Sequence, residues 1–151
     1  MNGKGDTYRP VNKKQYDKNY ERIFMKTRSP NSKYYITKAD GEFMPQFRGL
    51  PCEVCGSTHM TCGHHNIPKG RCKALRYELK NMTVLCPTHH TMSNDLAAHS
   101  TNAFAVREYV NWFEKNRPEQ YRWLMDNKNM VRKFTFKQAF ENLKQGREAW
   151  I

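Results

Sequence analysis

The spacing of apolar residues predicts a short helix near the start of the chain. Residues 15–28 carry four large apolar side chains at helical spacing: Tyr16, Tyr20, Ile23 and Phe24. The Ser-Pro-Asn-Ser stretch at 29–32 ends this helix, because proline and small polar residues favour turns. Between residues 33 and 47, a Tyr-Tyr-Ile-Thr run is followed by Ala-Asp-Gly-Glu and a proline, which favours a short strand and a turn.

Three further helices are predicted after residue 100. Thr101 and Asn102 suit the cap of a helix whose apolar stripe consists of Phe104, Val106, Tyr109, Val110 and Phe113. Pro118 ends that helix and suits the first turn of the next, and a last amphipathic stretch covers residues 136–149. Since the aromatic residues of these helices fall on apolar stripes, packing in a core is favoured over stacking on bases.

The middle third of the chain predicts a β-hairpin followed by a helix. Residues 61–68 favour the end of a first strand, residues 82–86 a second strand, and residues 87–96 a helix that opens on a proline. With helices on both sides, this order predicts the α+β class. The expected organisation is a basic N-terminal extension (1–49), the hairpin centre (50–97) and a helical C-terminal region (98–151).

Composition and charge narrow the class of partner. With 151 residues, 38% of them hydrophobic, the chain forms one domain with a small core, which a metal ion would help to stabilise. The formal net charge of +12 favours nucleic acid as the partner over plain solubility. The first residues lack the apolar segment of a signal peptide, and no apolar run approaches the ~20 residues of a membrane helix. We therefore expect a cytoplasmic protein with no membrane partner.

All five cysteines and all six histidines lie between residues 52 and 99, which indicates a metal-organised centre. Cys52-x2-Cys55 and Cys86-x2-His89 form two ligand pairs of the kind that hold a structural Zn²⁺ ion tetrahedrally. In an intracellular protein, paired cysteines favour metal binding over a disulfide. Zinc would pin the predicted helix after Cys86 to the Cys52–Cys55 turn.

Three neighbouring residues compete for this zinc shell: His59, Cys62 and Cys72. The two cysteines have no partner at a standard spacing. We interpret them as buried thiols or, at most, alternate ligands.

The remaining polar residues indicate a second metal site. On a helix, His89 and His90 point about 100° apart, so His90 can face away from the zinc. His90 and Asn94 are four residues apart and share a helix face. Together with one histidine of the His64-His65 pair they would hold a metal whose shell leaves positions for a phosphate oxygen and water. The other histidine of that pair, on the opposite face of the strand, would be free to activate water.

The order of these residues resembles that of the HNH endonucleases. Those enzymes have Asp-His on a first strand, then an asparagine, and then Leu-Cys-x-x-Cys-His, with a zinc knuckle beside them. Here His64-His65 is followed by Asn81 and by Val-Leu-Cys-x-x-His-His-x3-Asn at 84–94, and the likeness covers residues 50–97. The segments 75–77 and 93–94 are also similar, more weakly, to phage NinG-type recombination proteins, which implies a phage-encoded protein acting in the host cell.

The resemblance implies a zinc-stapled ββα-metal, treble-clef-like fold and a role for each residue. His65 would be the general base that deprotonates the attacking water, and Asn81 would orient the loop and the base through hydrogen bonds. His64, His90 and Asn94 would bind one catalytic divalent cation.

Two departures from the family pattern matter. His89 stands where the family has a cysteine, so an alternative register makes His89 the family histidine and leaves the zinc shell incomplete; the spacing from Asn81 favours His90. His64 stands where the family often has Asp. A carboxylate favours Mg²⁺, whereas two imidazoles favour Mn²⁺, Ni²⁺, Co²⁺ or Zn²⁺.

Four basic residues between the two strands are expected to grip DNA phosphates: Lys69, Arg71, Lys73 and Arg76. The expected function is a metal-dependent DNA endonuclease, acting alone, as a homodimer or with a protein partner. The alternative is a non-catalytic zinc module that binds nucleic acid, or an accessory factor in phage recombination or DNA packaging. His65 separates these hypotheses, because only cleavage requires it.

Overall fold

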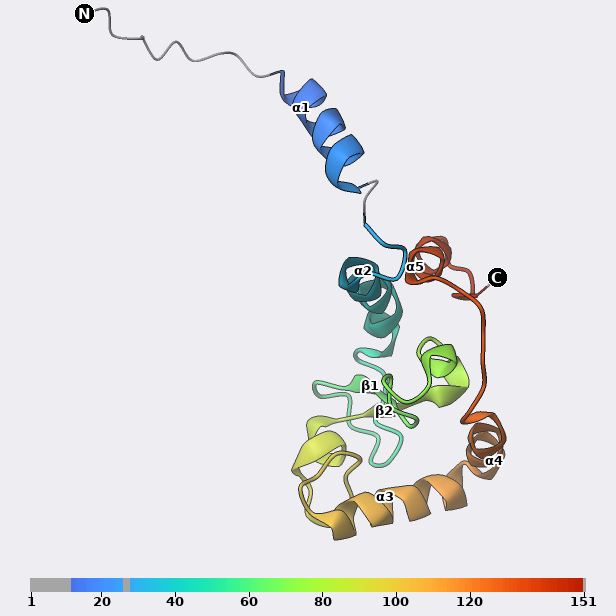
Figure 1. The fold of residues 1–151 in the computed structure, drawn as a ribbon. Coiled ribbons are helices and arrows are strands. Elements are labelled where there is room, and N and C mark those ends of the chain that lie inside the picture. Colours follow the sequence, from blue (N-terminus) through green and yellow to red (C-terminus); the bar gives the residue numbers. More distant parts are fainter. Residues whose placement is uncertain (1–11, 26–27, 151) are drawn as a thin grey trace, which may run out of the picture.

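The computed structural model describes residues 12–25 and 28–150. The predicted α+β class is confirmed, since helices surround a two-stranded sheet (Figure 1). The helices are α1 (Lys13–Tyr20), α2 (Lys33–Phe43), α3 (Ala103–Asn116), α4 (Pro118–Asn127) and α5 (Phe136–Lys144). The strands are β1 (Cys62–His65) and β2 (Met82–Leu85). Short helical turns are η1 (Glu21–Met25), η2 (Met44–Phe47), η3 (Lys73–Leu75), η4 (Leu79–Asn81) and η5 (Thr88–Met92).

The hairpin lies between two groups of helices (Figure 1). On one side α2 packs against α5, and the two share a core that includes Ala39, Phe43, Phe47, Phe136 and Ala139. On the other side α3 and α4 cover a core that includes Ile67, Leu75, Phe113 and Leu124. A third cluster joins Cys52, Leu85 and Cys86 to Ala98 and Tyr109. Segments from both ends of the described chain therefore hold the hairpin in place.

The strand and turn predicted for residues 33–47 are wrong, because this segment forms α2 and η2. Ala39, Phe43 and Phe47 recur every four residues and are all buried in one core cluster, which α2 shares with α5, so tertiary packing outweighs the local preference for a strand. Asp40, within α2, accepts hydrogen bonds from Arg76.

The C-terminal helices agree with the prediction. Asn102 caps α3, its Oδ1 accepting from the backbone N of Phe104 at 3.0 Å, and α4 begins at Pro118. The last helix ends at Lys144 rather than near 149, because the chain turns at Gly146, whose φ is +69°. The packing role of the α3 stripe is confirmed for Tyr109 and Phe113, which are buried, but Phe104 and Val110 are exposed. The four apolar side chains predicted for the first helix are also exposed.

The predicted hairpin is confirmed. Its strands are antiparallel, with Cys62 opposite Leu85 and His65 opposite Met82. Gly63, on β1, lets Met82 and Phe47 approach the strand closely. A Cβ at this position would lie 2.7 Å from both Met82 Cε and Phe47 Cδ2. Glycine therefore lets η2 pack directly on the strand that carries His64 and His65.

The helix predicted for residues 87–96 is only partly formed. The helical turn η5 ends at Met92, and Ser93 is extended, with φ −73° and ψ 141°. The Ser93 hydroxyl accepts from the backbone N of Asp95 and of Leu96, both at 3.1 Å, and this local turn replaces further helix. Asn94 consequently lies beyond the helix that was expected to align it with His90. No helix among the described residues is long and apolar enough to cross a membrane.

Candidate metal centre

Four predicted zinc ligands lie together. The donor atoms of Cys52, Cys55, Cys86 and His89, here the cysteine cluster, are all within 4.8 Å of one another and could hold a metal ion. Cys55 Sγ lies 3.8 Å from Cys86 Sγ, and His89 Nδ1 lies 3.7 Å from Cys52 Sγ and 3.4 Å from Cys86 Sγ. A tetrahedron with zinc–sulfur bonds of about 2.3 Å has edges of about 3.8 Å, so the donors have the spacing that zinc requires.

Local backbone structure brings the two ligand pairs together. Gly56 has a φ of +74° and donates its N–H to Cys52 O at 2.7 Å, which closes a tight turn around Cys52 and Cys55. Glu53 N donates to Val84 O at 2.9 Å, so this turn is fixed to β2. Cys86 and His89 follow β2 directly. Burial raises the pKa of the Cys52 thiol, but backbone N–H groups, that of Cys86 foremost, lower it overall and favour the thiolate.

The competing residues lie outside this cluster. His59 is exposed, and the buried Cys72 donates its thiol to Met130 O at 3.4 Å. Cys62 instead lies beside His90, with its Sγ 3.9 Å from His90 Nδ1. The Cys-x2-Cys and Cys-x2-His pairs are thus the set that the fold brings together.

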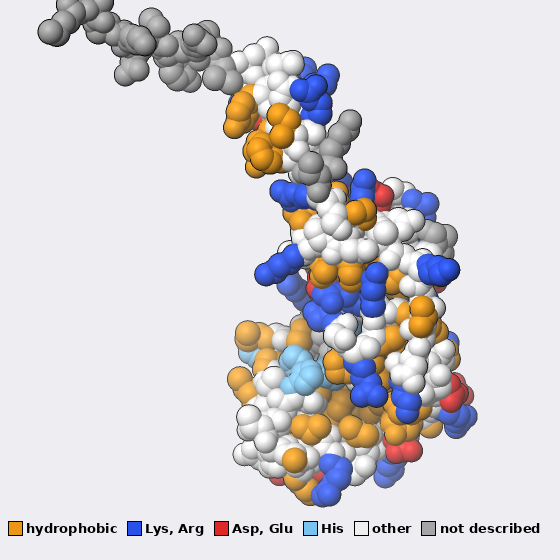
Figure 2. All heavy atoms as spheres, viewed as in Figure 1, with side chains coloured by type: hydrophobic (Ala, Val, Ile, Leu, Met, Phe, Trp, Pro, Cys, Tyr) orange, Lys and Arg blue, Asp and Glu red, His pale blue; other side chains and the backbone are white. Residues whose placement is uncertain are grey.

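A second group of donors consists of His64, His90 and His99, here the histidine cluster, whose nitrogens also lie within 4.8 Å of one another. Their rings form a triangle with centroid separations of 5.5 Å (His64–His90), 4.7 Å (His64–His99) and 5.3 Å (His90–His99). Figure 2 shows histidine side chains gathered at the surface of the molecule. His64 and His90 were predicted as metal ligands, and His99 was not.

His99 reaches the cluster because the chain folds back after Ser93. Ala98 N donates to His89 O at 2.9 Å, and His99 N donates to His90 O at 2.8 Å. Asn94 is exposed, and its backbone O accepts from Asn102 Nδ2 at 3.0 Å, so the shared helix face that supported it as a ligand is absent. The one sequence signal for His99 was that it is the last of the clustered histidines.

The histidine cluster fits a divalent cation. His64 Nδ1 is buried and has no hydrogen-bond partner among the described residues, an arrangement that costs free energy unless something binds the nitrogen. Burial, and then the neighbouring His99, His90 and His65, lower the pKa of His64 to about 3. Burial also lowers the pKa of His90. Neutral imidazoles are the form that binds metals, and an all-nitrogen set suits Mn²⁺, Ni²⁺, Co²⁺ or Zn²⁺ better than Mg²⁺.

His65 lies next to the histidine cluster with a different partner. Its Nε2 donates to Arg76 O at 2.8 Å, which leaves Nδ1 as the nitrogen with a lone pair. Burial lowers the pKa of His65, so the imidazole is neutral at pH 7. His64, His65, His90 and His99 line one cavity of about 300 Å³, here the histidine cavity, together with Met44, Gly63, Pro68 and Lys69. A neutral imidazole and three candidate metal donors therefore line the same cavity.

Asn81 is fully buried and holds the loop that follows His65. Its Oδ1 accepts from Ile67 N at 2.7 Å, and its Nδ2 donates to Ile67 O at 2.9 Å and to Leu75 O at 3.0 Å. Leu75 precedes Arg76, whose carbonyl accepts from His65. Asn81 therefore holds the loop one residue from the hydrogen bond that orients the His65 imidazole.

The four predicted phosphate contacts are not equivalent. Lys69 and Arg71 are exposed, and Lys69 lines the histidine cavity. Arg76 is mostly buried and paired with Asp40. Lys73 Nζ donates to Phe134 O at 3.0 Å and lies over the rings of Phe134 and Phe136. Arg76 and Lys73 thus already have partners within the protein, although Lys73, like Lys69 and Arg71, is exposed.

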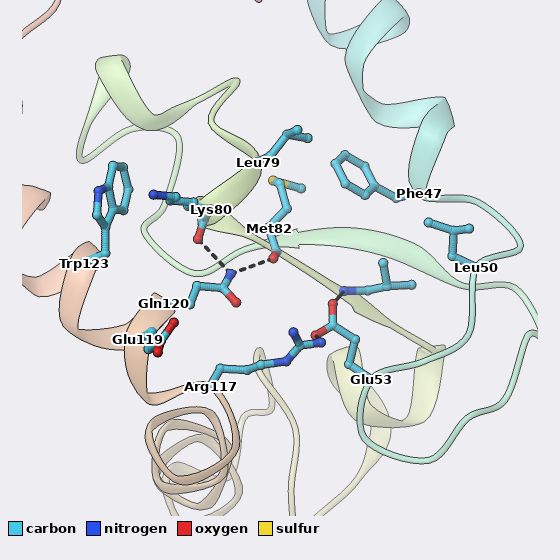
Figure 3. A pocket seen from close by; sticks show the side chains of 11 residues that line it. Phe47, Leu50, Glu53, Leu79, Lys80, Met82, Arg117, Glu119, Gln120 and Trp123 are labelled. Atoms are coloured by element: carbon cyan, nitrogen blue, oxygen red, sulfur yellow. Dashed lines mark hydrogen bonds and ion pairs between the residues drawn. The ribbon is translucent and has the colours of Figure 1, made fainter.

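A larger cavity, about 660 Å³, lies elsewhere, along the outer edge of β2 (Figure 3). Its lining includes neither His nor Cys. Gln120 Nε2 donates to Lys80 O and Met82 O, and Val84 N donates to Glu53 Oε1, whose carboxylate also pairs with Arg117. These side chains satisfy the free edge of the sheet, so the cavity has a structural explanation.

Comparisons of the chain with protein-family models, with curated proteins and with solved structures find no significant match.

Proposed function

We propose that this protein is a metal-dependent DNA endonuclease of the HNH type. The observation that carries the proposal is the pairing of His65 with the histidine cluster in one cavity. General-base catalysis needs a neutral imidazole with one nitrogen free, and His65 has its Nε2 engaged and its Nδ1 available. Phosphodiester hydrolysis by a single metal needs an incomplete protein shell, and three histidines leave coordination positions open.

Each residue then has a defined task. His64, His90 and His99 would hold the divalent cation, which supplies Lewis-acid stabilisation of the charge on the phosphate. His65 Nδ1 removes the proton from the attacking water. Asn81 keeps the loop, and so the Arg76 carbonyl, where it fixes the tautomer of His65. The cysteine cluster, which zinc would close, anchors His89 and thereby the position of the next residue, His90.

The charge of the chain agrees with DNA as the substrate. The formal net charge is +12, and Lys69, on the wall of the histidine cavity, lies where a phosphate of the bound strand would approach. The DNA affinity should fall steeply with salt concentration. The expected setting stays that of a phage protein acting in the host cytoplasm, alone or with a partner.

The test is cleavage of supercoiled plasmid by protein that retains one Zn²⁺ per chain and is freed of weakly bound metal. Mg²⁺, Mn²⁺, Ni²⁺ and Zn²⁺ are titrated into the wild type and into His65→Ala. The control is His59→Ala, an exposed histidine outside both clusters. Cleavage that depends on added metal and on His65, but not on His59, supports the nuclease. Salt-sensitive DNA binding without cleavage under any metal favours the zinc-containing binding module.

A further inference from the structure

A chain of contacts leads from α2 to His65. Asp40 accepts from Arg76 Nε at 2.8 Å and from Arg76 Nη2 at 2.6 Å, a bidentate ion pair. The Tyr77 hydroxyl donates to the same carboxylate at 3.1 Å. The backbone O of Arg76 accepts from His65 Nε2 at 2.8 Å. One carboxylate on a helix outside the hairpin therefore holds the residue whose carbonyl orients the base.

We infer that Asp40 is a positioning residue for the His65 general base, acting through the side chain and the carbonyl of Arg76. The inference rests on the proposed nuclease function. Asp40 belongs to neither group of metal donors found among the described residues, and its oxygens are already engaged by Arg76 and Tyr77. It touches no reacting atom and acts through the loop alone.

The loop between β1 and β2 is held from two sides. Asn81 fixes it from inside through Ile67 and Leu75, and Asp40 fixes it from α2 through Arg76 and Tyr77. α2 is itself packed on α5, so the anchor is a rigid element rather than another loop. A base held by a backbone carbonyl is only as well placed as the loop that supplies the carbonyl, which is why a second anchor would matter.

Asp40 also restrains a cation at the cavity. Lys69 Nζ lies 3.6 Å from Asp40 Oδ2, and Lys69 lines the histidine cavity beside His65. The carboxylate of Asp40 therefore has two positive side chains, Arg76 and Lys69, as ion-pair partners.

The test compares Asp40→Asn with Glu78→Gln. Glu78 lies close to Arg76 in the sequence. It forms a similar, partly buried ion pair with Arg132 at 3.1 Å, and this pair makes no contact with His65. Steady-state cleavage should show kcat reduced on the order of tenfold in Asp40→Asn, with KM and DNA affinity near wild type, because a well-placed general base contributes about 10²–10⁴-fold. Glu78→Gln should retain the wild-type kcat.

Two further measurements distinguish a positioning role of Asp40 from a general loss of stability. Arg76→Lys keeps the charge but loses the bidentate geometry, and it should lower kcat less than Asp40→Asn does. Imidazole proton–nitrogen correlation spectra should show His65 as the Nε2-protonated tautomer in the wild type, and faster solvent exchange of that proton in Asp40→Asn. The spectrum needs no activity and reports on the hydrogen bond even if a variant is partly destabilised.

The outcomes separate the proposed nuclease function from the positioning role of Asp40. If the wild type cleaves no DNA with any metal, the proposed function fails, whatever the spectra show. If the wild type cleaves and Asp40→Asn has the same kcat and the same His65 spectrum, the positioning role is overturned. A loss of activity that Glu78→Gln shares would also overturn it, because the effect would then reflect loosening of the fold in general.

Discussion

The cysteine cluster and the histidine cluster differ in how they are built. The cysteine cluster takes its four donors from two short motifs, each spanning four residues, and the turn at Gly56 closes around them. The histidine cluster takes single histidines from β1, η5 and the loop after Ser93, and it brings together three donors rather than four. A closed shell suits a stabilising metal and an open one suits chemistry, so the two sites should respond differently to the same kind of substitution.

Removal of a zinc ligand should have the largest effect. Cys52→Ser takes away a thiolate that is buried and next to Leu85 in the core, and zinc binding contributes folding free energy directly. We expect loss of the bound zinc and unfolding of the hairpin region at 25 °C, measured by metal analysis and circular dichroism. Cys72→Ser, a buried cysteine outside both clusters, is the control. Retained zinc and an unchanged Tm in Cys52→Ser would refute the zinc assignment.

Removal of the proposed base should affect activity more than metal content. His65→Ala should reduce metal-dependent plasmid cleavage about 10²–10⁴-fold, the usual contribution of a general base. Zinc content and DNA affinity should stay close to wild type, because His65 belongs to neither cluster of donors. The Tm should fall, because the buried imidazole and its hydrogen bond to Arg76 O are lost. Plasmid cleavage at the wild-type rate in His65→Ala would remove the base from the mechanism.

Substitutions of His99 and Asn94 should differ in their effect on the affinity for the second metal. His99→Ala should weaken binding of the second metal on the order of 10- to 100-fold or more, as even supporting groups around metals have effects of that size. Asn94→Ala should leave the affinity unchanged, because Asn94 is exposed and lies past the end of η5. Metal titration by calorimetry on zinc-loaded protein measures both. A stronger effect of Asn94→Ala would return the ligand role to that residue.

His99 also illustrates what the sequence could and could not predict. The two ligand pairs of the cysteine cluster, the hairpin and the cap of α3 are local features, set by spacing within a few residues, and they were predictable. His99 reaches His64 only because the Ser93 hydroxyl stops the helix and the returning loop pairs with η5. Helical periodicity cannot foresee such a turn, so it selected Asn94.

Long-range packing accounts for the other differences. Residues 33–47 form a helix because α5, about a hundred residues later, covers their apolar face. Arg76 and Lys73 look like free cations in the sequence, yet they are taken up by Asp40 and by Phe134. The partners lie too far away in the sequence for a pattern of nearby residues to reveal them.

The smallest effect is expected from Gly63→Ala, which should disturb the histidine cluster but not the cysteine cluster. In Gly63→Ala the new methyl would lie 2.7 Å from side-chain atoms of Met82 and Phe47, so these side chains or the segments that carry them must shift, at a cost of about 1–3 kcal/mol in the free energy of unfolding. Gly41→Ala, in α2 with nothing within 4 Å of the new Cβ, should be neutral or stabilising by up to about 1 kcal/mol. Denaturant unfolding of both variants measures the difference.

Because Gly63 precedes His64 and lines the histidine cavity, the shift should also move a ligand of the histidine cluster. The cysteine cluster has no donor on β1, so its zinc should be unaffected. We therefore expect Gly63→Ala to weaken the second metal while keeping one zinc per chain. Equal loss of both metals would show that the two sites form one cooperative unit, in which a closed shell and an open shell cannot be disturbed separately.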